Sequence, residues 1–550
     1  MATSPFPPPP GTRVDGSAGV RRGRRLLATR QFGPGEVIGT FRNPLLALPV
    51  ERGMRTTCNH CLRVAGDPAV TQLRACTGCK FVVYCSVACQ RASWAAVHKH
   101  ECKVFTRMAS RTGKDWLPTP VRAVMQVMLL LKAGNAAATA SFGDGGSLEG
   151  NVDAFKRDAE VWNDLKLQSM AAVVYGGILE SEEMLERAER VICKIQTNAF
   201  NWLDADTGRA GVFLDPALAM VNHSCVPNAF IGFNGRTATL RTQQGIEPGD
   251  EIEISYIDYT LPRATRQEEL RLYHFQCQCS RCKDELNVYQ ICAESPAIPL
   301  NTFSLQPDLQ KLRLPPIEGP GMSSAEIDTI YKAWKAAAIP ESQDPIQLAQ
   351  ARWKLCKPLA DAKMWAVEPL PSTLLQLVNY YQDGHPKALA LSCFLATECE
   401  PYKLVAPFMP WRIKGVMMIA KLLSGTAQIT ASGELAHACS HKGLIEILSK
   451  SDQVSMCEAM LRLVVHYAPL GESDDWEVLS EATTMLDDIE SLEGRQNQSA
   501  LLRAWAKYPQ DPEGGAFFHS VVLKPVNELA ALAIEIVDAE LGNGKSLVRR

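Results

Sequence analysis

The 550-residue sequence has no apolar run close to the ~20 residues that a membrane-spanning helix needs. It also lacks an excess of basic charge: the formal net charge of -3 provides no general attraction to nucleic acid or to an anionic membrane. The opening MATSPFPPPP contains neither a basic leader nor an apolar stretch, so we expect no secretory signal. We therefore expect a protein of the cytoplasm and/or nucleus, in which the 18 cysteines serve as reduced thiols and metal ligands.

The composition is that of an ordinary globular protein. Hydrophobic residues make up 46% of the chain and charged residues 21%. A chain of this length is too long for one hydrophobic core, and about three or four domains are expected.

Seven cysteines and one histidine lie between residues 58 and 102 at metal-ligand spacing. They form four short pairs: Cys58 and Cys61, Cys76 and Cys79, Cys85 and Cys89, His98 and Cys102. The spacing to Cys102 favours His98 over His100. Eight ligands fill two tetrahedral sites, as closed structural zinc requires. The alternative is a disulfide-rich surface module or a set of scattered core thiols. Four consecutive pairs favour two interleaved zinc ions.

A second cysteine group, Cys277, Cys279 and Cys282, supplies only three ligands. A fourth is needed for a tetrahedral site, and Cys225 in the polar segment Asn-His-Ser-Cys is the clearest candidate. Between them, residues 249–256 alternate apolar and polar residues and predict a half-buried strand that ends at a tyrosine. We therefore expect a third zinc site close to this strand.

These motifs, in this order, resemble the SET and MYND domain proteins, a family of protein lysine methyltransferases whose SET domain is interrupted by a MYND zinc module. The likeness is specific over residues 14–285 and looser beyond. The matching segments are Arg22-Gly23 with Leu26, Phe32 to Ile38, Tyr84-Cys85-Ser86, Trp94 to Cys102, Asn198 to Asn201, Asn222 to Cys225, Tyr256, and Cys277 to Cys282.

The resemblance implies an α+β multidomain fold: a β-rich SET fold interrupted by the zinc module, followed by an all-α, tetratricopeptide-like domain. No clean 34-residue repeat is present, so the label for the last domain comes from analogy. The expected divisions are a disordered proline-rich tail (1–13), the first SET part (14–52), the MYND module (53–102), a helical SET insertion (103–190), the SET core (191–260), a post-SET zinc segment (261–285), a linker (286–322) and the helical domain (323–550).

The same resemblance implies roles for nine residues outside the metal sites. Tyr256 supplies the hydroxyl at the point of methyl transfer, and Phe200 and Tyr273 line the lysine channel. The residues implied to bind S-adenosylmethionine are Arg22, Gly23, Arg24, Asn222, His223 and Phe275, the last by stacking on adenine. For Phe200, burial in a core is an equally good interpretation, and a lone histidine such as His223 is more often a core residue.

The chemistry of lysine methylation requires such residues. Methyl transfer is an in-line displacement, so the enzyme acts mainly by alignment and exclusion of water. The substrate lysine must arrive neutral although its reference pKa is about 10.4. A narrow aromatic channel disfavours the ammonium by removing water, which lowers that pKa.

One position departs from the family pattern. The cofactor loop of the family usually reads Gly-x-Gly, whereas here it reads Gly23-Arg24-Arg25. If this position needs a left-handed backbone, Arg25 costs about 1–2 kcal/mol in strain. The run of arginines also fits a nuclear import signal, but the strand-like Leu26-Leu27-Ala28 that follows favours a solvated strand flank.

Two function classes follow from these observations. The first is a protein-lysine N-methyltransferase acting on histone or non-histone proteins. The second is an adaptor in which a weakened SET core only holds the other modules, with proline-rich peptides as ligands of the MYND module. The acidic stretch 472–477 fits a solvated face, or a docking surface for a basic substrate tail. Neither class involves sequence-specific nucleic acid or a membrane, and a monomer is expected.

Overall fold

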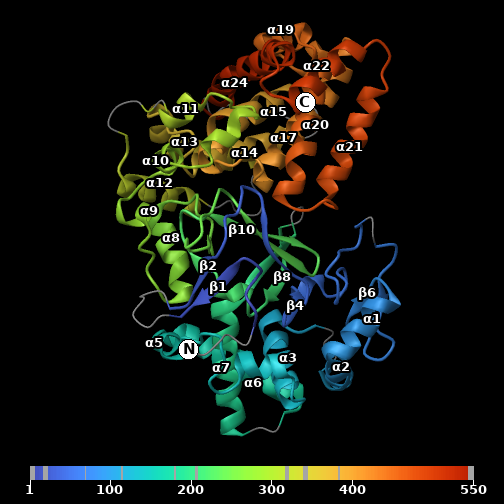
Figure 1. Ribbon diagram of the computed structural model, residues 1–550, viewed down its shortest axis with the longest axis vertical. Coiled ribbons are helices and arrows are strands. Elements are labelled where there is room, and N and C mark those ends of the chain that lie inside the picture. The colour runs from blue at the N-terminus through green and yellow to red at the C-terminus, as the bar shows by residue number, and fades with distance from the viewer. Residues whose placement is uncertain are drawn as a thin grey trace.

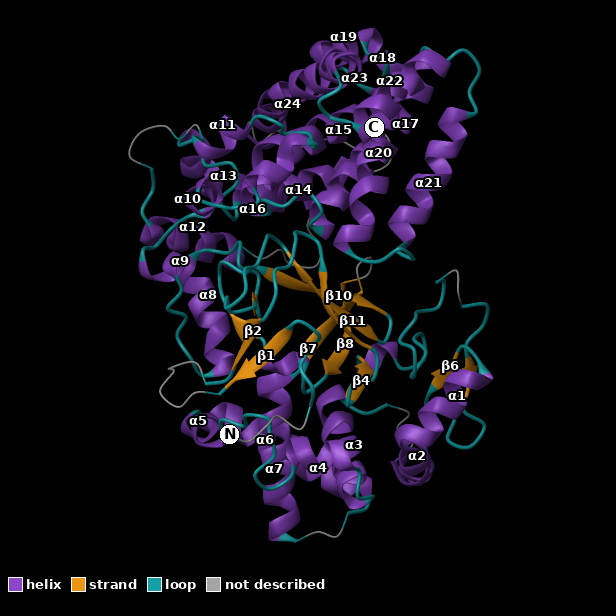
Figure 2. Ribbon diagram, viewed as in Figure 1, coloured by secondary structure: helices purple, strands orange, loops and turns teal. Residues whose placement is uncertain are grey.

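The computed structural model describes residues 6–16, 23–67, 70–112, 116–178, 181–204, 208–315, 317, 321–337, 345–381 and 385–542. Short strands form a central β core, with helices above and below it and the cysteine-rich module to one side (Figures 1 and 2). The predicted α+β class, with a β-rich core and an all-α C-terminal domain, is confirmed.

The β core consists of two three-stranded sheets and two strand pairs. One sheet has the order β10-β11-β3, and the other has the order β4-β8-β7. Their interior contains the large buried side chains Phe32, Phe213, Leu240 and Ile252. The strands are β1 (Thr12–Asp15), β2 (Arg25–Ala28), β3 (Val37–Phe41), β4 (Leu46–Pro49), β7 (Phe200–Asp204), β8 (Gly208–Leu214), β9 (Asn222–His223), β10 (Ala229–Asn234), β11 (Thr237–Thr242) and β12 (Glu253–Ile254).

The parallel pair β9–β12 positions the candidate site. Glu253 pairs with Asn222 and Ile254 with His223, and the N–H of Ser224 donates to the Ile254 carbonyl at 2.9 Å. The Asn-His-Ser-Cys segment therefore lies beside the strand that leads to Tyr256. The short 3-10 helix η3 (Leu218–Met220) precedes β9.

The cysteine-rich module follows β4. Its elements are η1 (Glu51–Gly53), β5 (Arg74–Ala75), β6 (Val83–Tyr84), α1 (Val87–Ser93), the π-helical turn η2 (Trp94–His98) and α2 (Lys99–Thr112). The Ser86 side chain caps α1 by accepting from the Cys89 N–H at 3.1 Å. Stacked rings of Phe81 and Phe105, 4.6 Å apart, join the loop before β6 to α2.

The insertion after this module is helical, as the sequence predicts. It comprises α3 (Thr119–Lys132), α4 (Ala136–Phe142), α5 (Val152–Arg157), α6 (Ala159–Gly176) and α7 (Glu182–Asn198). These helices share one core with the cysteine-rich module, including Phe105, Val124 and Ile192. No single helix among the described residues has the length and apolar character to cross a membrane, although the sharply bent pair α3–α4 meets the same criteria together.

Helices α8 (Arg263–Leu270), η4 (Arg271–Tyr273) and α9 (Ser280–Lys283) follow the β core. The C-terminal domain then contains α12 (Ser324–Ala336), α13 (Pro345–Asp361), α14 (Leu370–Tyr381), α15 (Pro386–Phe394), η6 (Leu395–Cys399), α16 (Glu400–Lys403), α17 (Pro410–Ala431), α18 (Leu435–Ala438), α19 (Lys442–Lys450), α20 (Gln453–Gly471), α21 (Glu477–Glu490), α22 (Gln496–Lys507), α23 (Pro512–Phe517), η7 (Phe518–Leu523), α24 (Lys524–Val537) and η8 (Asp538–Gly542).

The expected linker over 286–322 differs from the structure. Residues 288–313 form α10 (Val288–Ala293), η5 (Ile298–Thr302) and α11 (Leu309–Arg313). Tyr289, Phe303 and Leu312 are buried in the core of the helical domain, where the Phe303 ring lies 4.6 Å from that of Trp505. The prolines that suggest a linker separate short helices whose apolar side chains pack inward.

The expected disordered tail also differs from the structure over residues 6–13. Pro9 is buried, and its side chain lies so close to Gly39 that a β-carbon there would meet it at 2.9 Å. The N–H of Thr12 donates to the Pro9 carbonyl at 3.1 Å as β1 begins. Residues 1–5 lie outside the described part of the chain.

The acidic turn between α20 and α21 is an internal contact. Asn234 Nδ2 donates to Ser473 Oγ at 3.1 Å and to Asp475 Oδ1 at 2.6 Å. Arg63 of the cysteine-rich module pairs with Asp475 Oδ2 at 3.1 Å. The turn thus joins the helical domain to both the β core and the cysteine-rich module, instead of forming only the solvated face that its charge suggests.

Candidate active site and metal centres

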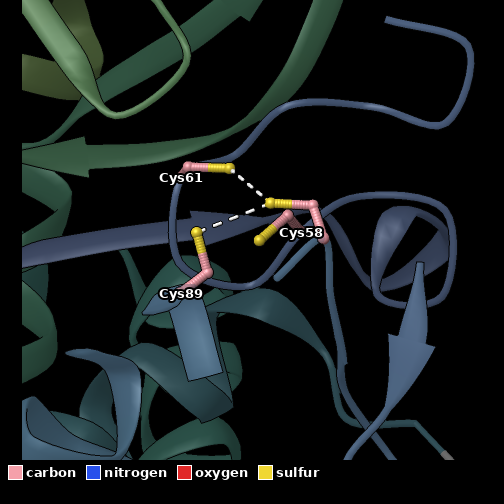
Figure 3. A group of neighbouring side chains, drawn as sticks. Cys58, Cys61 and Cys89 are labelled. Carbon is pink, nitrogen blue, oxygen red and sulfur yellow. Dashed lines mark hydrogen bonds between the residues drawn. The ribbon is translucent and has the colours of Figure 1, made fainter. Parts of the chain in front are cut away.

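The first predicted ligand group, Cys58, Cys61, Cys85 and Cys89, lies together in the cysteine-rich module. Figure 3 shows the sulfurs of Cys58, Cys61 and Cys89 directed toward one another. The Sγ of Cys85 lies 3.6 Å from that of Cys61 and 3.5 Å from that of Cys89. The ligands come from loops on both sides of the β5–β6 hairpin and from the start of α1.

The second group, Cys76, Cys79, His98 and Cys102, is fully buried. Nε2 of His98 lies 3.4 Å from the Sγ of Cys76 and 3.7 Å from the Sγ of Cys79. The two cysteine sulfurs of residues 76 and 102 are 3.9 Å apart. The ligands alternate along the chain with those of the first group, as the spacing predicts.

A buried polar network supports the second group. The other ring nitrogen of His98 lies 3.5 Å from Glu101, whose carboxylate also accepts from Arg122 Nε at 2.9 Å and Gln126 Nε2 at 2.8 Å. Arg122 reaches Asn59 as well, at 2.7 Å. Burial opposes ionisation of Glu101, but Arg122 and His98 outweigh it and hold its pKa at about 2. A carboxylate behind a ligating histidine fixes the orientation of the ring.

The third group joins Cys225 to Cys277, Cys279 and Cys282, all buried. The Sγ of Cys225 lies 3.9 Å from that of Cys277 and 3.6 Å from that of Cys282. Gln267 of α8 holds the loop with two bonds, donating to the Cys277 carbonyl at 3.0 Å and accepting from its N–H at 3.1 Å. Residues more than fifty positions apart in the sequence therefore meet in one cluster.

The geometry of all three groups fits zinc. Four sulfurs about 2.3 Å from a tetrahedral ion lie about 3.8 Å from one another. The sulfur–sulfur separations above fall between 3.5 and 3.9 Å. Sets of four cysteines, or of three cysteines and one histidine, are those of closed structural sites. Each site thus uses all four positions for protein ligands.

Tyr256 lies at the meeting point of the β core and the third cluster. Its hydroxyl donates to the Val221 carbonyl at 2.7 Å, and its ring centroid is 4.9 Å from that of Tyr273. Burial, with Tyr273 and two glutamates nearby, raises the pKa of Tyr256 above its usual range. The phenol is therefore neutral at physiological pH.

His223 bridges Tyr256 and the third cluster. Its Nδ1 accepts from the N–H of Tyr256 at 3.1 Å. Because Nδ1 accepts, a neutral ring carries its proton on Nε2, which faces the Sγ of Cys225 at 3.3 Å. The His223 side chain thus contacts both Tyr256, the candidate catalytic residue, and Cys225, a candidate metal ligand.

The predicted cofactor loop lies against Asn222. The Asn222 amide donates to the Arg24 carbonyl and to Glu251 Oε1, both at 2.8 Å. Gly23 has φ +71°, and a β-carbon built there would meet no atom within 4 Å. Arg22 lies outside the described residues.

The expected backbone strain at Arg25 does not occur. Arg25 is the first residue of β2, is absent from the described residues with positive φ, and pairs with Asp15 at 2.5 Å. The left-handed conformation falls on Gly23 instead. The departure from the family pattern therefore creates no conflict with the backbone of this loop.

The remaining aromatic candidates lie around the same region. The Phe275 side chain is 38% exposed, and its ring is 5.9 Å from that of His223. Tyr273 is partly buried beside Tyr256. Phe200 is partly buried in the β core, where it pairs with Phe213, and both the channel and the core interpretation stay open.

Glu251 is a site residue that the sequence reasoning missed. Its carboxylate holds the Asn222 amide, and its carbonyl accepts from Asn228 Nδ2 at 2.8 Å. Asn228 in turn accepts from the Glu253 N–H at 2.9 Å. The polar side of the alternating 249–256 strand pattern is the signal that could have indicated it.

Comparison with known proteins finds likeness in the cysteine-rich module and along about half of the chain. Residues 58–102 match the family model for the MYND finger. The chain is 31% identical to SET domain and MYND-type zinc finger protein 6 of Schizosaccharomyces pombe, over 48% of this chain and 50% of that protein. These likenesses confirm the resemblance to SET and MYND domain proteins.

Two further relatives are named as histone-lysine N-methyltransferases. They are human SMYD3, with 30% identity over 50% of this chain and 62% of that protein, and Arabidopsis thaliana ASHR1, with 31% identity over 48% and 54%. The alignments thus span about half to three-fifths of these relatives.

A solved structure of Rubisco LSMT bound to AdoMet aligns over 92% of this chain and 94% of that chain. The identity is 11% and the TM-score is 0.28, which is too low to support an argument.

Proposed function

We propose that this protein is a protein-lysine N-methyltransferase that uses S-adenosylmethionine and acts on histone or non-histone proteins. The observation that carries the proposal is the position of Tyr256, held by His223 and Val221 beside an aromatic wall and a four-cysteine cluster. The named relatives support the same reaction class.

S-adenosylmethionine, when bound, supplies an electrophilic methyl group on sulfur. The open space at Gly23, the carboxamide of Asn222 and the exposed ring of Phe275 suit its polar and aromatic parts. Asn222 holds the Gly23–Arg24 loop in place, while Phe275 offers a face on which adenine can stack. Arg22, Arg24 and His223 complete the proposed cofactor set.

The aromatic side chains prepare the substrate amine. The packed rings of Tyr256 and Tyr273 exclude water from a lysine placed against them, which disfavours the ammonium and leaves a neutral nucleophile. The neutral phenol of Tyr256, anchored on the Val221 carbonyl, orients the amine without carrying a charge. Phe200 is the third proposed member of this channel.

The three cysteine groups are proposed to hold three zinc ions per chain, two in the MYND module and one after the SET core. With four protein ligands at each site, none has an open position for substrate, so their role is structural. The third site fixes Cys225, and through His223 it fixes Tyr256. Cytoplasmic and/or nuclear location and a monomeric state stay predictions.

Calorimetric titration with S-adenosylmethionine tests the proposal. We expect saturable binding, and Phe275→Ala should weaken it about 2- to 10-fold because one stacking contact is worth about 0.5–1.5 kcal/mol. Tyr508→Ala, at an exposed tyrosine of the helical domain, is the control and should bind as the wild type does. Absence of binding at millimolar cofactor would contradict the proposal and favour the adaptor function, with proline-rich peptides at the MYND module as the ligands to try.

A further inference from the structure

Two buried arginines lie against the third cysteine cluster. Arg266 of α8 is 1% exposed and Arg281 of α9 is 3% exposed. Nη2 of Arg266 donates to the Sγ of Cys282 at 3.7 Å. Arg281 comes from the same short helix as Cys282 and directly precedes it.

Neither guanidinium has a carboxylate partner within ion-pair distance among the described residues. Apart from the Arg266–Cys282 contact, their hydrogen bonds go to backbone carbonyls: Arg266 to Leu261, and Arg281 to Tyr259 and Leu286. Asp328 lies near enough to Arg266 to interact with it electrostatically, but both its oxygens accept from the Ala264 N–H, at 2.9 and 3.1 Å. Two positive charges are thus buried without an acidic residue to balance them.

Burying an unpaired charge is expensive, typically several kcal/mol for each ion even after relaxation. The neighbouring cluster supplies the missing negative charge if it is metallated. Four thiolates around one divalent zinc carry a net charge of -2, and two arginines carry +2. The second cluster has a histidine among its ligands, and there Arg122 is balanced by Glu101.

We infer that Arg266 and Arg281 are the counter-charges of a zinc–tetrathiolate cluster and act as positioning residues for the active site. The inference rests on the zinc site and the reaction proposed above.

The hydrogen bonds of the two arginines connect the cysteine cluster to the loop that follows Tyr256. The carbonyls they hold, those of Tyr259 and Leu261, belong to the segment that directly follows Tyr256. Tyr256 is also tied to Cys225 through His223. The cluster therefore holds Tyr256 in two ways. The His223 imidazole accepts from the N–H of Tyr256, and the two arginines hold the loop that follows Tyr256.

Charge-neutral variants test the role of the arginines. Arg266→Met and Arg281→Met keep an apolar stem of similar length but remove the charge, and we expect one of the three zincs to be released to a chelating dye about 10- to 100-fold faster. Arg→Lys at either position should restore part of the retention, because it keeps the charge but loses the forked donors.

Arg412→Met is the matched control. Arg412 is 5% exposed and bonds to Asn301 Oδ1 and the Val405 carbonyl, both at 2.8 Å, in the helical domain. Its loss should lower the melting temperature without changing zinc release. Equal zinc release from the wild type and both methionine variants at positions 266 and 281 would overturn the inference.

A charge-matched double variant separates charge from packing. Cys279→His reduces the cluster charge to -1, so the double variant Cys279→His/Arg281→Met is neutral with the one remaining arginine. It should hold the third zinc more tightly than Arg281→Met alone, and weaker or equal retention would contradict the charge argument. Zinc release is independent of catalysis: a protein with arginine-dependent zinc but no methyl transfer would refute only the proposed function.

Discussion

Nδ1 of His223 accepts a hydrogen bond from the backbone N–H of Tyr256 at 3.1 Å, while Nε2 of the same ring faces Cys225 at 3.3 Å. One imidazole therefore connects the proposed catalytic residue to the proposed metal cluster. Changes at this residue can be chosen so that one of the two bonds is kept.

Two variants of His223 should separate these bonds. Asparagine places an acceptor close to the position of Nδ1 but does not reach Cys225, so His223→Asn should release the third zinc about 10-fold faster. Glutamine places a donor near Nε2, so His223→Gln should retain zinc while its kcat falls. Zinc release and steady-state kinetics check both. Identical behaviour of the two variants in both measurements would contradict the bridging role.

Removing the charge of Glu101 should unfold the MYND module. The carboxylate accepts from Arg122 and Gln126 and lies behind His98, so Glu101→Gln leaves the buried Arg122 without its charged partner. Breaking a buried pair typically costs about 3–5 kcal/mol. Elemental analysis should show loss of zinc from this module, and urea unfolding should show the destabilisation. Glu446→Gln, at an exposed helical ion pair, is the control and should change neither.

The acidic turn should control the contact between domains more than it controls stability. Asp475→Ala removes one acceptor that Asn234 and Arg63 share, but exposed pairs of this kind are worth only about 0–1 kcal/mol. We expect faster amide exchange in the turn and in the β10–β11 hairpin, with little change in melting temperature. Asp474→Ala, whose side chain forms no hydrogen bond among the described residues, should leave exchange unchanged. Equal rates of amide exchange in Asp475→Ala and Asp474→Ala would contradict this contact.

The stability of the helical domain should fall in mild acid because of His385. Its Nδ1 caps α15 by accepting from the Lys387 N–H at 3.1 Å, and burial, with Lys387 nearby, lowers its pKa from 6.5 to about 4. As the pH falls, the unfolded chain binds a proton first, so this stability is present above about pH 6.5 and is lost toward pH 4. We expect a loss of about 1–2 kcal/mol between pH 7 and pH 5.

His385→Asn provides the control for this pH dependence. Asparagine is a good helix cap that does not titrate in this range, so the variant should lose less stability between pH 7 and pH 5. Urea unfolding at the two pH values measures the difference. A variant with the same pH dependence as the wild type would exclude His385 as the cause.

The sequence predicts those parts of the site that depend on local spacing or on the four ligands that a zinc ion requires. Cysteine spacing places the two MYND ligand groups, and the need for a fourth ligand joins Cys225 to a cluster fifty residues later. The family motif assigns Tyr256 and His223 to one active site, and the parallel β9–β12 pair brings them together. In these cases the sequence motif is enough to indicate which residues lie together.

Other features depend on packing between distant segments and leave no such pattern. Arg266 and Arg281 look like ordinary surface arginines of a polar helix until α8 and α9 are folded against the cluster. The prolines after residue 297 indicate a linker, although Phe303 is buried against Trp505, more than two hundred residues away. Local composition does not indicate which face of a short segment another domain will cover.

The proposed methyl transfer is tested most directly by supplying labelled S-adenosylmethionine and an array of lysine-containing peptides to the wild type and to Tyr256→Phe. We predict labelled lysine peptides with the wild type and a rate about 100-fold lower with the variant, which should keep its zinc content and melting temperature. A wild type that binds the cofactor but labels no lysine, or a variant as active as the wild type, would contradict the account.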